Sequence, residues 1–176
     1  MRTLKYHVGS TLDGFIAHPD HTVGGFLFEG DHVTDFLDAH RSSDVVLMGR
    51  RTYDFGLRHG VTNPYPTMRQ YVFSRTMAAS PDPNVTLVSG DPVPFVRALK
   101  QEEGKGIWLC GGGELAATLA EAGLVDEVVV KLYPVVFGAG ISMFGRRIPQ
   151  TALQLRHTKV YENGVLLLTY RVDAPR

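Results

Sequence analysis

The sequence has little of three things that would assign a protein to a class at once: cysteine, excess charge and long apolar runs. One cysteine, Cys110, excludes an intramolecular disulfide and suits a reducing compartment. Lys plus Arg and Asp plus Glu both number 18, so no overall field would recruit nucleic acid or an anionic membrane. The first ten residues, MRTLKYHVGS, lack the apolar segment of a signal peptide. The longest uncharged apolar run, 132–145, is broken by proline and glycine and is too short to span a bilayer. We expect a cytoplasmic protein.

What is present is an alternation of strand-like and helix-like segments along 176 residues, a length typical of one domain, 1–176. Short apolar runs predict strands at 4–9, 44–49, 70–74, 85–89, 107–110 and 126–134. Helical patterns lie between them at 32–40, after Gly49, after Asp91 and at 114–122, and 11–17 is predicted as a loop. Two β-rich runs flank Asn163-Gly164, which predicts a hairpin. The fold class is therefore α/β, with a mostly parallel sheet and an antiparallel hairpin at its C-terminal edge.

Three consecutive glycines, Gly111, Gly112 and Gly113, separate the strand IWLC from the helix ELAATLAEAG. Glycine inside regular structure costs roughly 0.5–1 kcal/mol relative to alanine, so we expect something to approach this backbone closely. Positions 111, 113 and 116 satisfy G-x-G-x-x-A, although no acidic residue ends the next strand. A tight turn without a ligand is the alternative. Glu114 would repel phosphate, so contacts there should come from the backbone.

Two further strand-to-helix or strand-to-loop junctions carry polar residues suited to phosphate. One has Gly49, Arg50, Arg51 and Thr52, and the other has Ser74 and Arg75. Guanidinium groups bind phosphate oxygens in pairs, and a helix N-terminus adds N–H donors. Solvated arginines are the ordinary alternative for each junction. Three such junctions at the carboxyl ends of strands favour a dinucleotide with several phosphates.

Four segments, STLDGFIA, VVLMGRRTYDFG, WLCGGGELAATLAEAGLVDEVVV and LYPVVFGAGISMFG, resemble the dihydrofolate reductase-like superfamily. They are most similar to its branch typified by the C-terminal reductase domain of the riboflavin-biosynthesis protein RibD. The resemblance implies a three-layer fold with a central mixed sheet, NADPH as cofactor and a homodimer. It also implies cofactor contacts, often with a cis Gly-Gly peptide, for Gly49, Arg50, Arg51, Thr52, Ser74, Arg75, Gly111, Gly112, Gly113, Glu114 and Leu115.

The resemblance places the substrate beside Leu12, Asp13 and Gly14. Asp13 is the candidate catalytic residue, as a proton donor, and a turn-shaping role is its alternative. The buried carboxylate of dihydrofolate reductases would fall at Val33. Helical spacing puts Val33, Phe36, Leu37 and His40 inward and Asp31, Asp35 and Asp38 on a solvated face. Asp35 is kept as a substrate-binding candidate, because a gap of one residue would change this count and a dihydrofolate reductase would need Asp31 or Asp35 turned inward. Arg58, His59 and Arg69 are candidates for a substrate phosphate.

These residues predict an NADPH-dependent reductase that delivers hydride to a C=N or C=O carbon of a small heterocyclic or ribosylamino-pyrimidine substrate. The alternatives are a dihydrofolate reductase and a catalytically silent NADP-binding protein. No metal site is predicted, because the histidines are scattered, and Cys110 is expected to be a core residue. The run VLLL at 165–168 does not alternate, which favours a homodimer through strands near 128–136 and 165–171.

Overall fold

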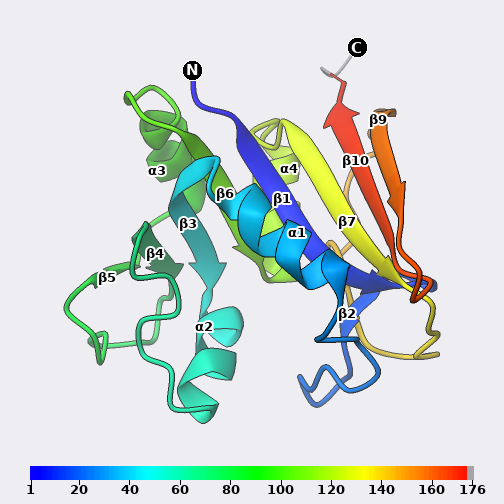
Figure 1. Ribbon diagram of the computed structural model, residues 1–176. Coiled ribbons are helices and arrows are strands. Elements are labelled where there is room, and N and C mark those ends of the chain that lie inside the picture. The colour runs from blue at the N-terminus through cyan, green and yellow to red at the C-terminus, as the bar shows by residue number, and fades with distance from the viewer. Residues whose placement is uncertain (174–176) are drawn as a thin grey trace.

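A computed structural model describes residues 1–173 and contains a central sheet of eight strands in the order β5-β4-β3-β6-β1-β7-β10-β9 (Figure 1). Its strands are β1 (Leu4–Thr11), β3 (Ser43–Gly49), β4 (Arg69–Phe73), β5 (Val85–Val88), β6 (Gly106–Gly111), β7 (Glu127–Tyr133), β9 (Leu153–Val160) and β10 (Leu166–Val172). The six strands from β5 to β7 are parallel, and β10 is antiparallel to both β7 and β9. The predicted mixed sheet with a C-terminal hairpin is confirmed.

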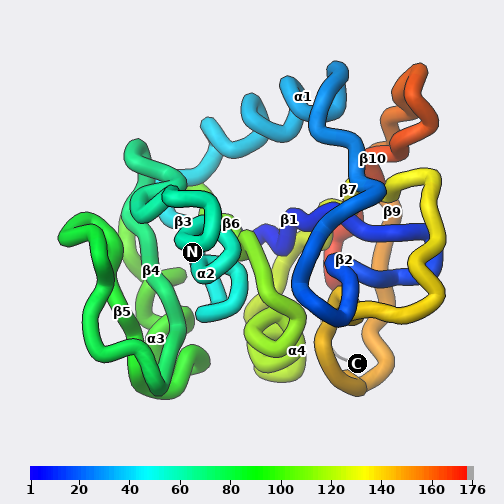
Figure 2. The backbone as a smooth tube through the Cα atoms, turned by 90° about the horizontal axis from the view of Figure 1, so that it is seen from below, coloured from blue at the N-terminus to red at the C-terminus, as the bar shows by residue number. Residues whose placement is uncertain are grey.

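Helices cover both faces of this sheet. They are α1 (Asp31–His40), α2 (Arg50–Arg58), α3 (Pro92–Leu99) and α4 (Gly113–Glu121). Figure 2 shows α1 on one side of the sheet and α3 and α4 on the other. Side chains of α3 and α4 pack against Leu4, Tyr6 and Leu47 in the larger core. Tyr53 of α2 and Phe36 of α1 pack with Trp108 on the opposite face. The architecture is therefore the expected three layers.

Several local predictions are confirmed in detail. The Asp91 side chain caps α3 by accepting a hydrogen bond from the Val93 amide, with Pro92 at the first helical position. Gly164 in the hairpin turn has φ +84°, and Gly123 after α4 has φ +66°, both in the left-handed region that favours glycine. Between residues 1 and 173 no helix is long and apolar enough to cross a membrane.

Two predictions about local structure were wrong. The segment expected to be a loop at 11–17 continues β1 to Thr11 and then forms β2 (Phe15–Ala17), which pairs with β8 (Ile141–Ser142). The partner strand is only two residues long and lies far away in the sequence, so no local pattern indicates it.

The inward face of α1 is only partly as predicted: His40 is buried and Phe36 packs with Trp108, as expected, but Leu37 does not face inward. Its buried residues are His32 and His40, whereas Leu37 is 62% exposed. Asp35, predicted on a solvated face, is half-buried against the C-terminal hairpin. Apolar spacing did not predict the positions of His32 and Asp35, because both are held by polar bonds to the C-terminal hairpin, which lies far away in the sequence.

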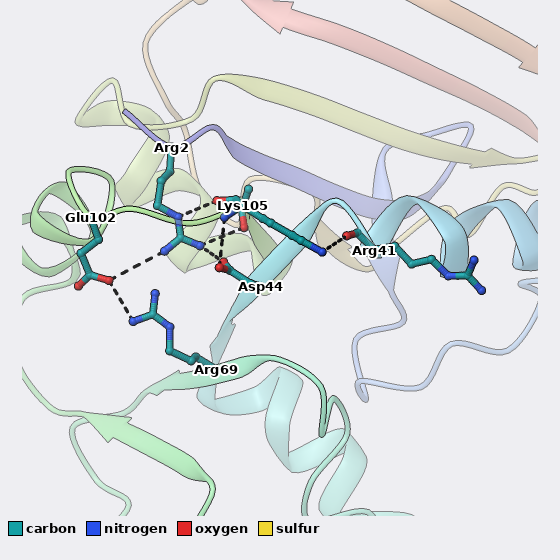
Figure 3. A network of polar contacts seen from close by, with 7 residues as sticks. Arg2, Arg41, Asp44, Arg69, Glu102 and Lys105 are labelled. Atoms are coloured by element: carbon teal, nitrogen blue, oxygen red, sulfur yellow. Dashed lines mark hydrogen bonds and ion pairs between the residues drawn. The ribbon is translucent and has the colours of Figure 1, made fainter.

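A network of ionic contacts ties together the amino ends of the central strands (Figure 3). Buried Arg2 donates through Nε to the Lys105 carbonyl at 2.7 Å and through Nη2 to the Asp44 carboxylate. Arg69 pairs with Glu102 at 3.0 Å, and Glu102 also lies 4.0 Å from Arg2. The proposed substrate-phosphate role of Arg69 is therefore wrong, since Arg69 starts β4 at the edge of the sheet opposite the glycine junctions.

Candidate cofactor and substrate site

The three predicted phosphate junctions meet at one edge of the sheet, the edge facing the viewer in Figure 2. They follow β4, β3 and β6, which are consecutive neighbours in the sheet and run parallel. Parallel neighbours end at the same edge, so Ser74, Gly49 and Gly111 begin a continuous row. Open α/β sheets bind ligands at this carboxyl edge.

Gly49, Thr52 and the Gly111–Gly112 step are in direct proximity. A Cβ added to Gly49 would lie 3.3 Å from the Gly112 nitrogen and 3.6 Å from the Gly111 oxygen. The Thr52 hydroxyl would lie 3.4 Å from a Cβ on Gly111 and 3.5 Å from one on Gly112. The Gly111–Gly112 peptide is cis, and Gly111 has φ +147°. These contacts bring two junctions, separated by about sixty residues of chain, into one surface.

The third glycine, Gly113, is close-packed against the protein's own backbone, whereas a ligand was expected there. A Cβ on Gly113 would lie 2.6 Å from both the Gly145 nitrogen and the Ser142 oxygen. The backbone that approaches Gly113 therefore belongs to the 142–145 loop of the same chain. Arg146 fixes this loop to α4 through Glu114 at 2.9 Å and Glu121 at 2.7 Å. Gly113 is buried, whereas Gly112 is half-exposed and meets only Thr52.

Both helices that start at this edge present uncapped N-termini. α2 begins after Gly49 and α4 after Gly112, and neither start has a side-chain cap. The first N–H groups of a helix have no partner within the helix, so these starts offer donors to an anion. α3, which the Asp91 side chain caps, has no such vacancy at its N2 amide. The open Gly112 backbone and the two free helix starts fit the diphosphate of a dinucleotide.

The arginines and Ser74 at this edge differ in their availability. Arg50 donates through Nε to both oxygens of Asp54, at 2.7 and 2.8 Å. Arg51 and Arg75 are exposed and make no ion pair within residues 1–173. The Ser74 hydroxyl accepts from the amides of the next turn, at 3.0 Å from Met77. Arg51 and Arg75 are thus the cations free to bind phosphate.

A groove of about 510 Å³ lies next to α2, lined by His21, Arg51, Asp54, Leu57 and Arg58. His21 belongs to the segment after β2 and has φ +67°. Two of the lining side chains are arginines, and Asp54 is neutralised by Arg50. The groove can therefore accept an anionic part of a ligand. Arg58 lines it, and exposed His59 bonds to the Phe55 carbonyl at 2.7 Å.

At the turn predicted to border the substrate, Asp13 connects two loops. Its carboxylate accepts from the Thr11 hydroxyl, from the Gly138 amide at 2.7 Å and from the Phe137 amide at 3.2 Å. The Thr11 hydrogen bond, with help from the two amides, lowers the pKa of Asp13. Gly14 has φ +85°, and Leu12 is exposed. These contacts correspond to the turn-shaping alternative, and a carboxylate so stabilised is a poor proton donor.

Asp35 is engaged by the C-terminal hairpin rather than by the central strands β1, β6 and β7. Its carboxylate accepts from Lys159 Nζ at 2.5 Å and from the Tyr161 hydroxyl at 2.7 Å. The hydrogen bond from Lys159 is the largest cause of its lowered pKa, followed by that from Tyr161. The carboxylate therefore joins α1 to β9 and to the hairpin turn.

The comparisons with known proteins agree with this geometry. The family model of the RibD C-terminal domain matches residues 2–167. The uncharacterized protein YwjB of Bacillus subtilis (strain 168) is 32% identical over 167 residues, covering 94% of this chain and 96% of YwjB. The chain belongs to the RibD C-terminal domain family.

Solved structures share the fold of this RibD C-terminal domain. A putative riboflavin biosynthesis protein from Shewanella sp. PV-4 aligns with a TM-score of 0.83 at 24% identity, covering 99% of this chain and 100% of that one. A second structure is the diaminohydroxyphosphoribosylaminopyrimidine deaminase/5-amino-6-(5-phosphoribosylamino)uracil reductase of Thermotoga maritima. It aligns with a TM-score of 0.73 at 16% identity, covering 98% of this chain and 57% of that one. Dihydrofolate reductase from Enterococcus faecalis, complexed with NADP(H), also aligns with a TM-score of 0.73 at 16% identity, covering 98% of this chain and 97% of that one.

The sequence reasoning missed a polar cluster on the α1 side of the sheet in this RibD C-terminal domain. His7 of β1, His40 of α1 and Lys131 of β7 are all buried there, beside the aromatic rings of Phe36 and Trp108. Strand alternation places His7 and Lys131 on the face opposite Tyr6 and Val130, which is the signal that could have found them. Within 1–173 no three His, Cys, Asp or Glu side chains are grouped as metal ligands would be.

Burial shifts the pKa of each group in this cluster. Desolvation lowers the pKa of His40 to about 4 and that of His7 well below its usual value. Desolvation also lowers the pKa of Lys131 to about 8 and raises that of Cys110 to about 11. At neutral pH the two imidazoles and the thiol are therefore uncharged, and the Lys131 ammonium carries the one charge of the cluster.

Proposed function

We propose that this protein is an NADPH-dependent reductase that transfers hydride to a C=N or C=O carbon of a small heterocyclic or ribosylamino-pyrimidine substrate. The most similar known activity is that of 5-amino-6-(5-phosphoribosylamino)uracil reductase. The observation that carries this proposal is the convergence of Gly49, Thr52 and the Gly111–Gly112 step at the carboxyl edge of the sheet. Membership of the RibD C-terminal domain family supports it.

Each part of the site has an assigned task in this proposal. The free N–H groups at the starts of α2 and α4 hold the cofactor diphosphate. Gly49, Gly112 and Leu115, which lies in the first turn of α4, are beside the diphosphate. Arg51 and Arg75 bind phosphate, including a 2′-phosphate, by charge-assisted hydrogen bonds. Bound there, NADPH would supply the hydride. The protein contributes mainly by aligning the two reacting rings and excluding water.

On the substrate side we assign Asp13 an organising task. Its three hydrogen bonds hold the Leu12–Gly14 turn against the 137–138 loop. The turn in this way forms a border of the substrate site, and the proton that accompanies hydride transfer comes from water. Asp13→Asn would test this, since the amide would keep part of the loop contacts but could not donate a carboxylic proton.

Dihydrofolate reduction is the weaker candidate. A pterin clamp needs a carboxylate turned toward the sheet, and Asp35 instead bonds to Lys159 and Tyr161 of the hairpin region. The position expected for the clamp holds Val33. A silent NADP-binding protein is the other candidate.

The deciding experiment measures NADPH binding and NADPH oxidation separately. Oxidation is followed at 340 nm with the riboflavin-pathway pyrimidine and, in parallel, with dihydrofolate. Turnover with the pyrimidine supports the proposal, and turnover with dihydrofolate alone replaces it. NADPH binding without turnover of either favours the silent protein, and absence of NADPH binding rejects all three.

We further propose a homodimer formed through β9 and β10; the predicted contribution of residues 128–133 is wrong, because Val128, Val129 and Val130 are buried within the sheet. All residues of β9 are exposed, including Leu153, Leu155 and Val160, and β10 is only half-buried. An open sheet edge with apolar side chains is a template for association, and a partner subunit would cover it.

A further inference from the structure

Three polar side chains between α1 and the sheet are at least nine-tenths buried and keep unused bonding capacity. Lys131 is 9% exposed, His40 8% and His7 6%. Nε2 of His7 and Nε2 of His40 have no hydrogen-bond partner within the described residues. Buried polar atoms without partners are rare in folded proteins, because each costs about 1–3 kcal/mol. Two such atoms in one cluster, beside the buried ammonium of Lys131, leave bonding capacity that a ligand could complete.

Lys131 has the largest unmet requirement, because its charge has no counterion. Its Nζ lies 3.7 Å from the centre of the Phe36 ring and 5.9 Å from that of Tyr133, and within 1–173 it makes no ion pair. The titratable groups facing it are His7 from β1, His40 from α1 and Cys110 from β6. None of them is an acid that is ionised at neutral pH.

The cluster adjoins the proposed cofactor site. In the sheet, Lys131 pairs with Gly9, and the Tyr133 ring packs over that glycine, 2.9 Å from where a Cβ would lie. Cys110 immediately precedes the Gly111–Gly112 step. A planar ring lying on this face could therefore reach both the Lys131 ammonium and the edge where Gly112 is exposed.

α1 covers the cluster of His7 and Lys131 on the sheet through packing of its side chains, without hydrogen bonds to these strands. Its polar contacts go to the hairpin and the preceding loop: His32 to Asn163 at 3.0 Å and to Leu27 at 2.9 Å, and Asp35 to Lys159. No hydrogen bond joins residues 31–40 to β1, β6 or β7 in the part of the chain that the structure describes. Figure 1 shows α1 crossing in front of these strands. The Phe36 ring over the ammonium occupies the place that a ligand ring would take.

We propose that the substrate is a planar heterocycle carrying an anionic oxygen, either a carboxylate or a ring enolate, and that Lys131 binds this oxygen beneath α1. The neutral imidazoles of His7 and His40 accept or donate hydrogen bonds at the ring edge, and Trp108 supplies an aromatic wall. This assignment rests on the proposed function, since it names the substrate class of the same site. Lys131 is a specificity-determining residue in it.

The test compares two probes that share one ring, orotate and uracil, of which only orotate carries a carboxylate. Binding to the NADPH-saturated protein is measured by calorimetry at pH 7. A charge-assisted contact predicts that orotate binds about tenfold or more tightly than uracil. Lys131→Met should reduce this preference to about one, and Lys131→Arg should restore part of it. Lys5→Met, which removes a half-buried lysine of β1 paired with Glu127, should leave the preference unchanged.

Melting temperature and NADPH affinity of Lys131→Met are measured alongside, to show that the variant is folded. A wild-type protein that does not prefer orotate, or a preference that survives in a folded Lys131→Met, would overturn the assignment. The same titrations without NADPH separate the two proposals. If the protein does not bind NADPH but still shows a Lys131-dependent preference for orotate, the reductase proposal is rejected and the anion site is kept. If the protein oxidises NADPH but shows no such preference, the anion site is rejected and the reductase proposal is kept.

Discussion

Gly113 and Gly145 are in backbone contact, so closely that a methyl group on Gly113 would lie 2.6 Å from the Gly145 nitrogen. Gly112, one residue earlier, is half-exposed, and a methyl group there would meet only the Thr52 hydroxyl at 3.5 Å. Adjacent glycines in one run thus serve two purposes. One is required by the fold, and the other leaves room for a ligand.

These two positions give a matched pair of variants. Gly112→Ala should fold with a melting temperature near that of the wild type and lose about tenfold or more in NADPH affinity, because its methyl group intrudes on the cofactor. Gly113→Ala should lose about 1–3 kcal/mol of stability or more, because backbone atoms must move. Calorimetry and urea unfolding measure the two effects. Normal NADPH affinity in Gly112→Ala would mean that the run is only a structural turn.

Cofactor preference tests the exposed arginine after β4. We expect the wild type to bind NADPH more tightly than NADH, because charge-assisted bonds to a 2′-phosphate are worth roughly 1.5–3 kcal/mol. Arg75→Ala should erode this preference and leave NADH affinity nearly unchanged. Arg69→Ala is the control, because Arg69 lies at the opposite edge of the sheet. Equal affinities for the two cofactors in the wild type would contradict the assignment.

The amino-edge network should matter for stability alone. Arg2→Met removes the buried partner of Asp44 and the hydrogen bond to the Lys105 carbonyl, and we expect a loss of about 2–4 kcal/mol. Because Asp44 is partly exposed, water can compensate for some of the loss. NADPH affinity should not change in the folded fraction, and a reduced affinity would show that the two edges of the sheet are coupled.

Acid should weaken the fold through His40. Its pKa is about 4 in the folded chain and near 6.5 when unfolded, so between these pH values only the unfolded chain binds the proton. Stability therefore falls as pH drops from about 6.5 to 4, by up to about 3 kcal/mol. Buried His7 acts in the same direction. Urea unfolding at pH 7 and pH 4.5 should show a smaller acid loss for His40→Phe, and an unchanged loss would assign the effect to other groups.

Association can be tested on the exposed face of β9. A homodimer should show a mass about twice 19.4 kDa by light scattering at micromolar concentration, with an interface on the order of 1,600 Å² or more. Leu155→Glu should shift the protein to monomer. Leu37→Glu, which changes a similarly exposed leucine on α1, should not. A wild-type mass near 19.4 kDa would reject the dimer.

The sequence predicted the parts of the fold that depend on local pattern. Strands buried on both faces, such as β3, are continuous apolar runs, and their parallel arrangement places every following junction at one edge. The proposed cofactor residues came together for that reason. The approach of Gly145 to Gly113 could not be predicted, because it depends on how a distant loop returns to the sheet.

The cluster beneath α1 was missed for a related reason. His7 and Lys131 occupy alternate strand positions, and histidine and lysine at such positions usually face water. Here α1, a helix rich in polar residues, covers them. Its apolar spacing predicted that Leu37 would be buried, whereas His32 is the buried residue. Which face of α1 turns inward is decided by contacts with the hairpin, which enters the chain more than a hundred residues later.

The position of β1 has a consequence for how the chain is made. Tyr6 pairs with Leu109 on one side and with Val128 on the other, so β1 is synthesised about a hundred residues before either of its neighbours. Until β6 and β7 have been synthesised, both edges of β1 are open, and contacts of such long sequence separation form slowly. We therefore expect β1 to remain unpaired, and open to association with other chains, until β6 and β7 have been made.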